Sequence, residues 1–376
     1  MVYKVLSVFG TRPEAIKMAP LVKKLADDPR FDSQVLVTAQ HREMLDQVLK
    51  YFAIKPDYDL NIMRPGQTLT AITSYALTGI GNILMEARPD IVLVHGDTTS
   101  TFAGALSAYY NKIKIGHVEA GLRTGCKYAP FPEEMNRHLA GVLADVHFAP
   151  TKMAVENLLK ENVPADRIFQ TGNTVVDALL QVVEGPDPNW ENIGLDTIDW
   201  RKKVILLTCH RRENWGEPME NIFSGIAELC KKYPDIEVIF PVHKNPIVRG
   251  LAGKHLSSLP QVHLTEPLDY LPLCHVLDKC YLVMTDSGGL QEEAPALGKP
   301  VLVLRDVTER PEGLEAGTAC LVGSDRERIV ETAGKLLTDR TLYHRMAKAI
   351  NPYGDGLASG RIADMLAAFL QKEESK

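Results

Sequence analysis

Three acidic side chains in the first half of the chain could carry proton chemistry if the fold brings them together. Asp97 lies in HGDTTS, Glu119 lies in HVEAGLR, and Glu133 lies in PFPEEMNR. Each acid alone has an ordinary structural explanation, as a helix cap or as a first-turn charge that favours the helix dipole. As a set they indicate more, because clustered carboxylates repel each other and some then acquire raised pKa values suited to proton transfer.

The segment TDSGGLQEEA at 285–294 predicts a diphosphate cradle. Ser287, Gly288 and Gly289 follow an apolar run and open a helix, so their backbone N–H groups would face an anion. Glu293 falls about one helical turn later on the same face, where a carboxylate could accept hydrogen bonds from a ribose diol.

Basic and imidazole side chains follow other apolar runs. GTRPEAIK at 10–17 suits an anion and is neither a Walker loop nor a GxGxxG motif. His210, in CHRREN, is placed to meet a phosphate or a leaving oxygen, although a core histidine is the plain alternative. Arg310, in TERPEG, adds a further cation. Together these groups suggest a nucleotide diphosphate bearing a group that reacts.

Six cysteines are scattered along the chain without a CxxC pair or a Cys/His cluster of zinc spacing. We expect buried reduced thiols and no metal site. Thiol chemistry at Cys209 beside His210 is disfavoured, because neighbouring side chains on a strand point to opposite faces.

These residues are positioned by an alternation of strands and helices. Runs such as IVLVHG and KVLSVFG are apolar without alternation, which is typical of parallel strands covered on both faces. The expected strands of the first half are 4–9, 34–38, 91–95, 113–118, 147–149 and 168–171, with helices at 15–26, 42–52, 69–87, 101–110, 133–144 and 152–161. The expected strands of the second half are 204–209, 236–241, 262–265, 281–285 and 301–304.

The alternation stops at 185–200, which we interpret as a surface connection near a domain boundary. The sequence therefore predicts an α/β protein of two doubly wound, Rossmann-like domains, 1–175 and 176–356, that face a central cleft. Ligands of such sheets bind beyond the carboxyl ends of the strands, where the candidate residues stand.

Composition excludes several classes of protein. The 376 residues carry 42 Lys and Arg against 48 Asp and Glu, a net charge of −6, which argues against a dedicated nucleic-acid binder. No stretch approaches the roughly 18 apolar residues of a membrane span. The first apolar run is too short for a signal peptide, so a cytoplasmic location is expected.

Seven motifs in order closely resemble the non-hydrolysing UDP-N-acetylglucosamine 2-epimerases of bacterial type. They are GTRPEAIK, HGDT, HVEAGLRT, FPEEMNR, CHRREN, DSGGLQEEAP and TERPEG, and the likeness covers essentially the whole chain. The resemblance implies a glycosyltransferase-B-like fold whose last helix, 357–372, packs back on the first domain.

The resemblance implies an isomerase that interconverts UDP-GlcNAc and UDP-ManNAc with no metal or redox cofactor, for cell-surface polysaccharide synthesis. UDP is eliminated to give 2-acetamidoglucal and is then added back. It implies that Asp97, Glu119 and Glu133 are the catalytic carboxylates, and it leaves open which of them removes the C2 proton. It also implies a catalytic role for His210, at the diphosphate. The implied substrate-binding set is Arg12, Lys17, Asp97, Glu119, His210, Leu268, Leu273, Ser287, Gly288, Gly289, Glu293 and Arg310.

Two further properties follow from the resemblance alone. Some bacterial members bind a second UDP-GlcNAc as an activator, and Gln40, Gln67 and His243 match parts of that allosteric site, whereas Glu43 and Gly66 depart from it. Family members are usually homodimers.

Three alternatives differ in product. A glycosyltransferase of the same fold would need an acceptor, a hydrolysing epimerase would release free ManNAc and UDP, and a nucleotide-sugar sensor would release nothing. The three acids together disfavour the sensor, because binding alone needs no such cluster.

Overall fold

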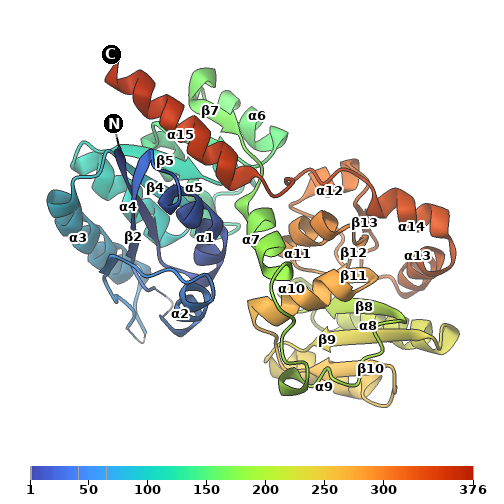
Figure 1. Ribbon diagram of the computed structural model, residues 1–376. Helices are drawn as coiled ribbons and strands as arrows, with labels where there is room; N and C mark the ends of the chain where they lie inside the picture. Colours follow the sequence, from blue (N-terminus) through green and yellow to red (C-terminus); the bar gives the residue numbers. More distant parts are fainter. Residues whose placement is uncertain (1, 41, 65, 376) are drawn as a thin grey trace. The chain divides into compact units, whose positions relative to one another are not determined.

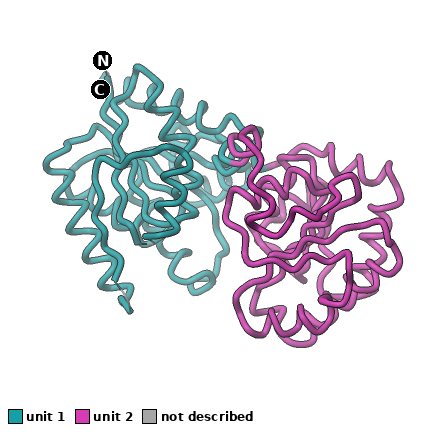
Figure 2. The backbone as a smooth tube through the Cα atoms, turned by 60° about the horizontal axis from the view of Figure 1, so that its bottom comes forward, with its two compact units in different colours: residues 1–178, 353–376 teal, residues 179–352 magenta. Residues whose placement is uncertain are grey.

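The computed structural model describes residues 2–40, 42–64 and 66–375, which form two compact units (Figures 1 and 2). Unit 1 comprises Met1–Ala178 and Tyr353–Lys376, and unit 2 comprises Leu179–Pro352. Each unit contains a parallel sheet with helices packed against it.

The sheet of unit 1 has seven strands in the order β3-β2-β1-β4-β5-β6-β7, and every neighbouring pair is parallel. Its central strands β1 and β4 are almost fully buried, as their mostly apolar sequences require. The strands are β1 (Tyr3–Phe9), β2 (Phe31–Val37), β3 (Tyr58–Asp59), β4 (Ile91–His95), β5 (Lys114–Val118), β6 (Val146–Ala149) and β7 (Ile168–Gln170).

Two helical layers cover this sheet. One contains α1, α2 and α15, and the C-terminal α15 packs along α1 although the two are far apart in sequence (Figure 1). The other contains α3, α4 and α5. The helices are α1 (Arg12–Ala26), α2 (Arg42–Tyr51), α3 (Leu69–Ala87), α4 (Thr99–Tyr110), α5 (Glu133–Leu143), α6 (Lys152–Lys160), α7 (Thr174–Val183, which crosses into unit 2) and α15 (Ala358–Glu374).

The sheet of unit 2 has six parallel strands in the order β10-β9-β8-β11-β12-β13. They are β8 (Lys203–Thr208), β9 (Ile236–Pro241), β10 (Val262–Thr265), β11 (Leu282–Thr285), β12 (Val301–Val303) and β13 (Ala319–Leu321). The main helices are α8 (Glu217–Lys232), α9 (Pro246–Leu256), α10 (Tyr270–Lys279), α11 (Gly288–Glu293), α12 (Pro311–Glu315), α13 (Arg326–Thr338) and α14 (Arg340–Ala347).

Two parallel sheets flanked by helices confirm the predicted fold class. The short strands β3 and β13 were not predicted. The stretch 185–200 was expected to be a surface connection, but two of its side chains, Leu195 and Ile198, are buried. Of the six cysteines, which were expected to be buried, Cys126 is exposed and Cys320 is half-buried. Among the described residues, no helix is long and apolar enough to cross a membrane.

Candidate functional site

The strand order of unit 1 reverses at β1, which lies between β2 and β4. At such a point the loops leaving the strands diverge and open a ligand-binding crevice. Gly10 ends β1 there. A Cβ on Gly10 would lie 1.8 Å from the Oγ1 of Thr38 and 2.4 Å from the Oγ of Ser100, so only glycine fits. These two hydroxyls are themselves hydrogen-bonded at 2.7 Å.

The buried carboxylate of Glu14 fastens the loop after β1 to the loop after β4. It accepts the backbone N–H groups of Gly10 at 3.0 Å and Thr11 at 2.8 Å, and the hydroxyl of Thr98 at 2.6 Å. Burial raises the pKa of Glu14 despite these bonds. Helix α1 begins at Arg12, earlier than expected, and the Thr11-x-x-Glu14 spacing of a capping box is the signal that would have found this start.

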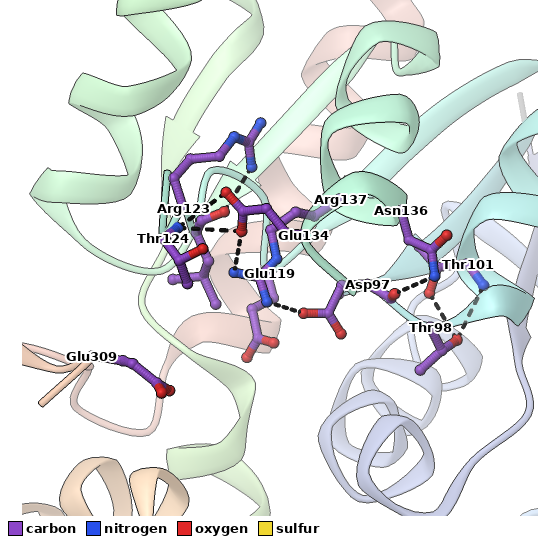
Figure 3. Close-up of polar contacts among 12 residues, drawn as sticks. Asp97, Thr98, Thr101, Glu119, Arg123, Thr124, Glu134, Asn136, Arg137 and Glu309 are labelled. Atoms are coloured by element: carbon purple, nitrogen blue, oxygen red, sulfur yellow. Dashed lines mark hydrogen bonds and ion pairs between the residues drawn. The ribbon is translucent and has the colours of Figure 1, made fainter. Parts of the chain in front are cut away.

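Asp97 follows the turn at Gly96, which comes directly after β4 and has a φ of 64°. Its carboxylate forms an ion pair with Arg137 of α5, and its carbonyl accepts the amide of Asn136 at 2.9 Å (Figure 3). Burial raises the pKa of Asp97, the charge of Glu119 raises it further, and Arg137 opposes both. A carboxyl group with a raised pKa is suited to exchanging a proton near neutral pH.

Glu119 follows β5 in a left-handed backbone conformation, with a φ of 60°. This conformation costs a non-glycine residue about 1 kcal/mol or more, so the surrounding contacts must hold it. Its Oε2 forms an ion pair with Lys17 of α1 and accepts the Nδ2 of Asn173 at 2.8 Å. Its Oε1 lies 3.4 Å from where a Cβ on Gly96 would be, which places this carboxylate beside the Asp97 turn. The structure thus brings Asp97 and Glu119 together.

The two neighbouring acids of α5, Glu133 and Glu134, have different environments. Glu134 is buried and accepts the N–H groups of Thr124 at 3.1 Å and Gly125 at 3.0 Å, with Arg137 at 3.2 Å (Figure 3). Burial alone would raise the pKa of Glu134, but these bonds outweigh burial and lower it. The half-buried carboxylate of Glu133 forms no hydrogen bond or ion pair with another described residue.

The strand order of unit 2 reverses at β8, next to β11. The fully buried Asp286 follows β11 and accepts the backbone N–H groups of His210 and Arg211, both at 2.8 Å. The Nδ1 of His210 lies 3.1 Å from the other carboxylate oxygen. Burial would raise the pKa of Asp286, but the bonds from His210 and Arg211 outweigh it, and the pKa is lowered. An ionised Asp286 therefore fixes His210 at the strand end.

The turn after Asp286 leaves backbone atoms uncovered. A Cβ on Gly288 would meet only the Nη2 of Arg211, at 3.9 Å. A Cβ on Gly289 would meet the Oε2 of Glu293 at 3.7 Å and the Oγ of Ser287 at 3.9 Å. Gly288 and Gly289 are thus approachable, with a guanidinium and a carboxylate beside them. Sequence reasoning did not select Arg211.

Arg310 forms an ion pair with the buried Glu292. The pKa of Tyr270 is raised well above its ordinary value by burial and then by neighbouring Cys274 and Glu293, which shows that Tyr270 lies near Glu293. Leu268 and Leu273 are half-buried on either side of Tyr270 in sequence, where α10 begins. Sequence reasoning did not select Tyr270.

Each of the three predicted effector-site residues has a different contact. Gln40 accepts the hydroxyl of Ser100 at 3.3 Å, and Gln67 accepts the N–H of Arg64 at 2.8 Å. His243, in unit 2, stacks its ring on His210 with 5.8 Å between centroids. No described contact joins Gln40 to Gln67. Among the described residues, no group of three His, Cys, Asp or Glu side chains is arranged to hold a metal ion.

Three buried histidines lie on the strands behind Asp97 and Glu119. His95 ends β4, and His117 on β5 is paired in register with His147 on β6. Burial lowers the pKa to about 4 for His95 and His117 and to about 3 for His147. A ring nitrogen of His117 bonds the carbonyl of Gly96 at 2.7 Å, so this layer supports the turn before Asp97.

Comparison with known proteins identifies the family of the chain. The family model described as "UDP-N-acetylglucosamine 2-epimerase" matches residues 23–367. The UDP-N-acetylglucosamine 2-epimerase of Bacillus subtilis is 58% identical over 96% of this chain and 94% of its own, and that of Escherichia coli K12 is 56% identical over 96% and 98%. The crystal structure of UDP-GlcNAc 2-epimerase from Neisseria meningitidis bound to UDP-GlcNAc is 51% identical, with a TM-score of 0.86 over 97% of this chain and 100% of that one.

The buried histidines should make the protein less stable as pH falls from about 6.5 towards 4. An unfolded histidine has an ordinary pKa of 6.5, and the folded values are about 4 and about 3, so the unfolded chain holds more protons in this window. His147→Asn removes one such group, so the drop in melting temperature between about pH 7.5 and about pH 5 should shrink. The exposed His344 provides a control, His344→Asn, which should keep the full drop. An unchanged drop in the His147 variant would contradict this explanation.

Proposed function

The chain belongs to the UDP-N-acetylglucosamine 2-epimerase family, and from this premise we propose that it interconverts UDP-GlcNAc and UDP-ManNAc without net hydrolysis. UDP leaves C1, 2-acetamidoglucal forms, and UDP is added back after a proton returns to the opposite face of C2. The observation that carries the proposal is the pair of carboxylates Asp97 and Glu119, which lie side by side and are each bound to a cation.

The order of bond changes follows from the acidity of C2. No carbonyl is attached to C2, so a carboxylate cannot remove its proton while UDP is still bound to C1. When the C1–O bond breaks, C1 becomes cationic and the neighbouring C2 proton becomes acidic. The bonding electrons of C1–O leave with UDP, and the electrons of C2–H form the C1–C2 double bond. The enzyme must therefore stabilise a leaving diphosphate and supply a carboxylate at C2.

We assign the C2 chemistry to unit 1. Asp97, Glu119 and Glu133 divide between them the transfer of the C2 proton and the stabilisation of positive charge at C1. The raised pKa of Asp97 suits proton transfer. The ion pair with Lys17 and the hydrogen bond from Asn173 hold the carboxylate of Glu119 in place, which suits electrostatic stabilisation of the cation.

We assign recognition of UDP to unit 2. His210, fixed by Asp286, and the approachable turn from Ser287 to Gly289 support diphosphate binding. The diphosphate set also contains Arg310 and, from unit 1, Arg12. Glu293 holds the ribose diol, and the segment with Leu268 and Leu273 holds the uracil. Because these groups and the carboxylates belong to different units, the proposal requires one substrate molecule to reach both.

Two other properties implied by the family stay predictions. One is a homodimer, and the other is activation by a second UDP-GlcNAc through Gln40, Gln67 and His243. Sedimentation of the purified chain tests the first, and sigmoidal dependence of the rate on UDP-GlcNAc tests the second. Supply of a cell-surface polysaccharide pathway in the cytoplasm belongs to the same proposal.

Product analysis tests the reaction itself. Purified protein incubated with UDP-GlcNAc alone should form UDP-ManNAc, with the amount of intact nucleotide sugar unchanged in the ³¹P spectrum. Release of UDP in proportion to free ManNAc would mean a hydrolysing epimerase. No reaction until a sugar or lipid acceptor is added would mean a glycosyltransferase.

Neutralising the carboxylates should separate catalysis from nucleotide binding. Asp97→Asn, Glu119→Gln and Glu133→Gln should each lower kcat by about a hundredfold or more, because each removes a charge from the C2 chemistry. The Kd for UDP, measured by calorimetry, should change by less than about threefold, since its proposed contacts lie in unit 2 apart from Arg12, which these substitutions leave in place. Glu156→Gln, at an exposed site on α6, serves as the control and should leave kcat unchanged. Wild-type turnover in all three variants would remove this assignment.

A further inference from the structure

Asn173 is a buried residue in GNTVVDAL, a segment to which the proposed function gives no role. Its Nδ2 donates to the Oε2 of Glu119 at 2.8 Å, across 54 residues of sequence. Its Oδ1 accepts the backbone N–H of Val175 at 3.1 Å, at the start of α7. Because the oxygen is engaged by an N–H donor, the amide can present only its NH₂ group to the carboxylate.

The backbone of Asn173 is held from the C-terminal segment of unit 1. Its N–H donates to the carbonyl of the buried Tyr353 at 2.7 Å. Gly172 and Gly354 pack against each other beside this bond, and a Cβ on Gly172 would lie 3.3 Å from the Cα of Gly354. Both glycines have positive φ angles, 89° and 139°, so the close approach depends on their lacking side chains. Asn173 therefore has little freedom to turn away from Glu119.

Glu119 needs such a fixed partner. Its backbone is in the left-handed region, which its own side chain does not favour. Lys17 supplies charge, but a lysine is a point charge on a flexible four-carbon chain, and it constrains direction weakly. The short side chain of Asn173 is hydrogen-bonded through both its amide oxygen and its amide nitrogen, so it constrains the orientation of the Glu119 carboxylate as well as its distance.

We propose that Asn173 is a positioning residue that orients the carboxylate of Glu119 toward the reacting sugar. This inference rests on the proposed function. The competing explanation is purely structural: Asn173 would only cap α7 and fasten the segment at Tyr353.

Two substitutions separate these explanations. Asn173→Ser keeps a side-chain oxygen suited to capping α7 but is too short to reach Glu119. It should lower kcat by about tenfold to a hundredfold, because a small misplacement of a catalytic group has effects of this size, with KM changed less than about threefold. Asn173→Asp keeps the shape and the capping oxygen but sets a second carboxylate against Glu119.

The aspartate variant should also move the acidic limb of the pH–kcat profile upward by about one unit or more, since adjacent carboxylates share a proton. Besides residue 173, the titratable or charged groups that act on Glu119 include Lys17 from α1, Asp97 and His95 from the end of β4, and His117 from β5. All of these stay in place in the variant, so the shift would report on position 173.

Asp177→Asn is the matched control. Asp177 accepts the N–H groups of Ala358 at 3.2 Å and Ser359 at 2.8 Å, so it holds the same part of unit 1 together but forms no hydrogen bond with Glu119. It should lower the melting temperature and leave kcat and the pH profile unchanged.

The outcomes are distinct. If wild type forms UDP-ManNAc and both Asn173 variants match its kcat and pH profile, the inference is overturned. It is also overturned if Asn173→Ser and Asp177→Asn lower kcat equally and the aspartate profile is unshifted. If wild type forms no UDP-ManNAc, the proposed function fails instead.

Discussion

The ion pair and hydrogen bond that hold the carboxylate of Glu119 are the contacts on which the site of unit 1 depends. A glutamate in a left-handed turn is an unfavourable local choice, and its side chain is kept in place by α1 through Lys17 and by the start of α7 through Asn173. Asp97 is held in the same manner by α5 through Arg137. Two acids that would otherwise repel each other are thereby kept adjacent, each with a cation, and burial leaves the pKa of Asp97 raised.

Both units use the same arrangement of a parallel sheet to gather these groups. In each, the strand order reverses next to a central strand, and a buried acidic side chain accepts backbone N–H groups of the loop after that strand. Glu14 does this in unit 1 and Asp286 in unit 2. The consequences differ, because Glu14 stabilises a tight glycine turn at the start of α1, whereas Asp286 fixes the imidazole of His210.

Sequence reasoning succeeded where one physical signal dominates. The strands Ile236–Pro241 and Val262–Thr265 were predicted with their observed bounds, because β-branched and apolar residues flanked by proline and polar residues indicate a strand. The strands Tyr58–Asp59 and Ala319–Leu321 were missed, since two or three residues at a sheet edge leave too short a pattern. The placing of Asp97 and Glu119 together could be argued from strand ends, but the roles of Arg137 and Asn173 could not. Arg137 bonds Asp97 from 40 positions away and Asn173 bonds Glu119 from 54 positions away, and neither an arginine nor an asparagine by itself indicates such a contact.

The measurement that tests the central claim most directly is the fate of the hydrogen at C2 when UDP-GlcNAc is incubated with the protein in D₂O. If the two held carboxylates exchange that proton with solvent during elimination and re-addition, UDP-ManNAc should carry deuterium at C2 and nowhere else on the sugar. UDP-ManNAc that formed while retaining its original C2 hydrogen would contradict the account.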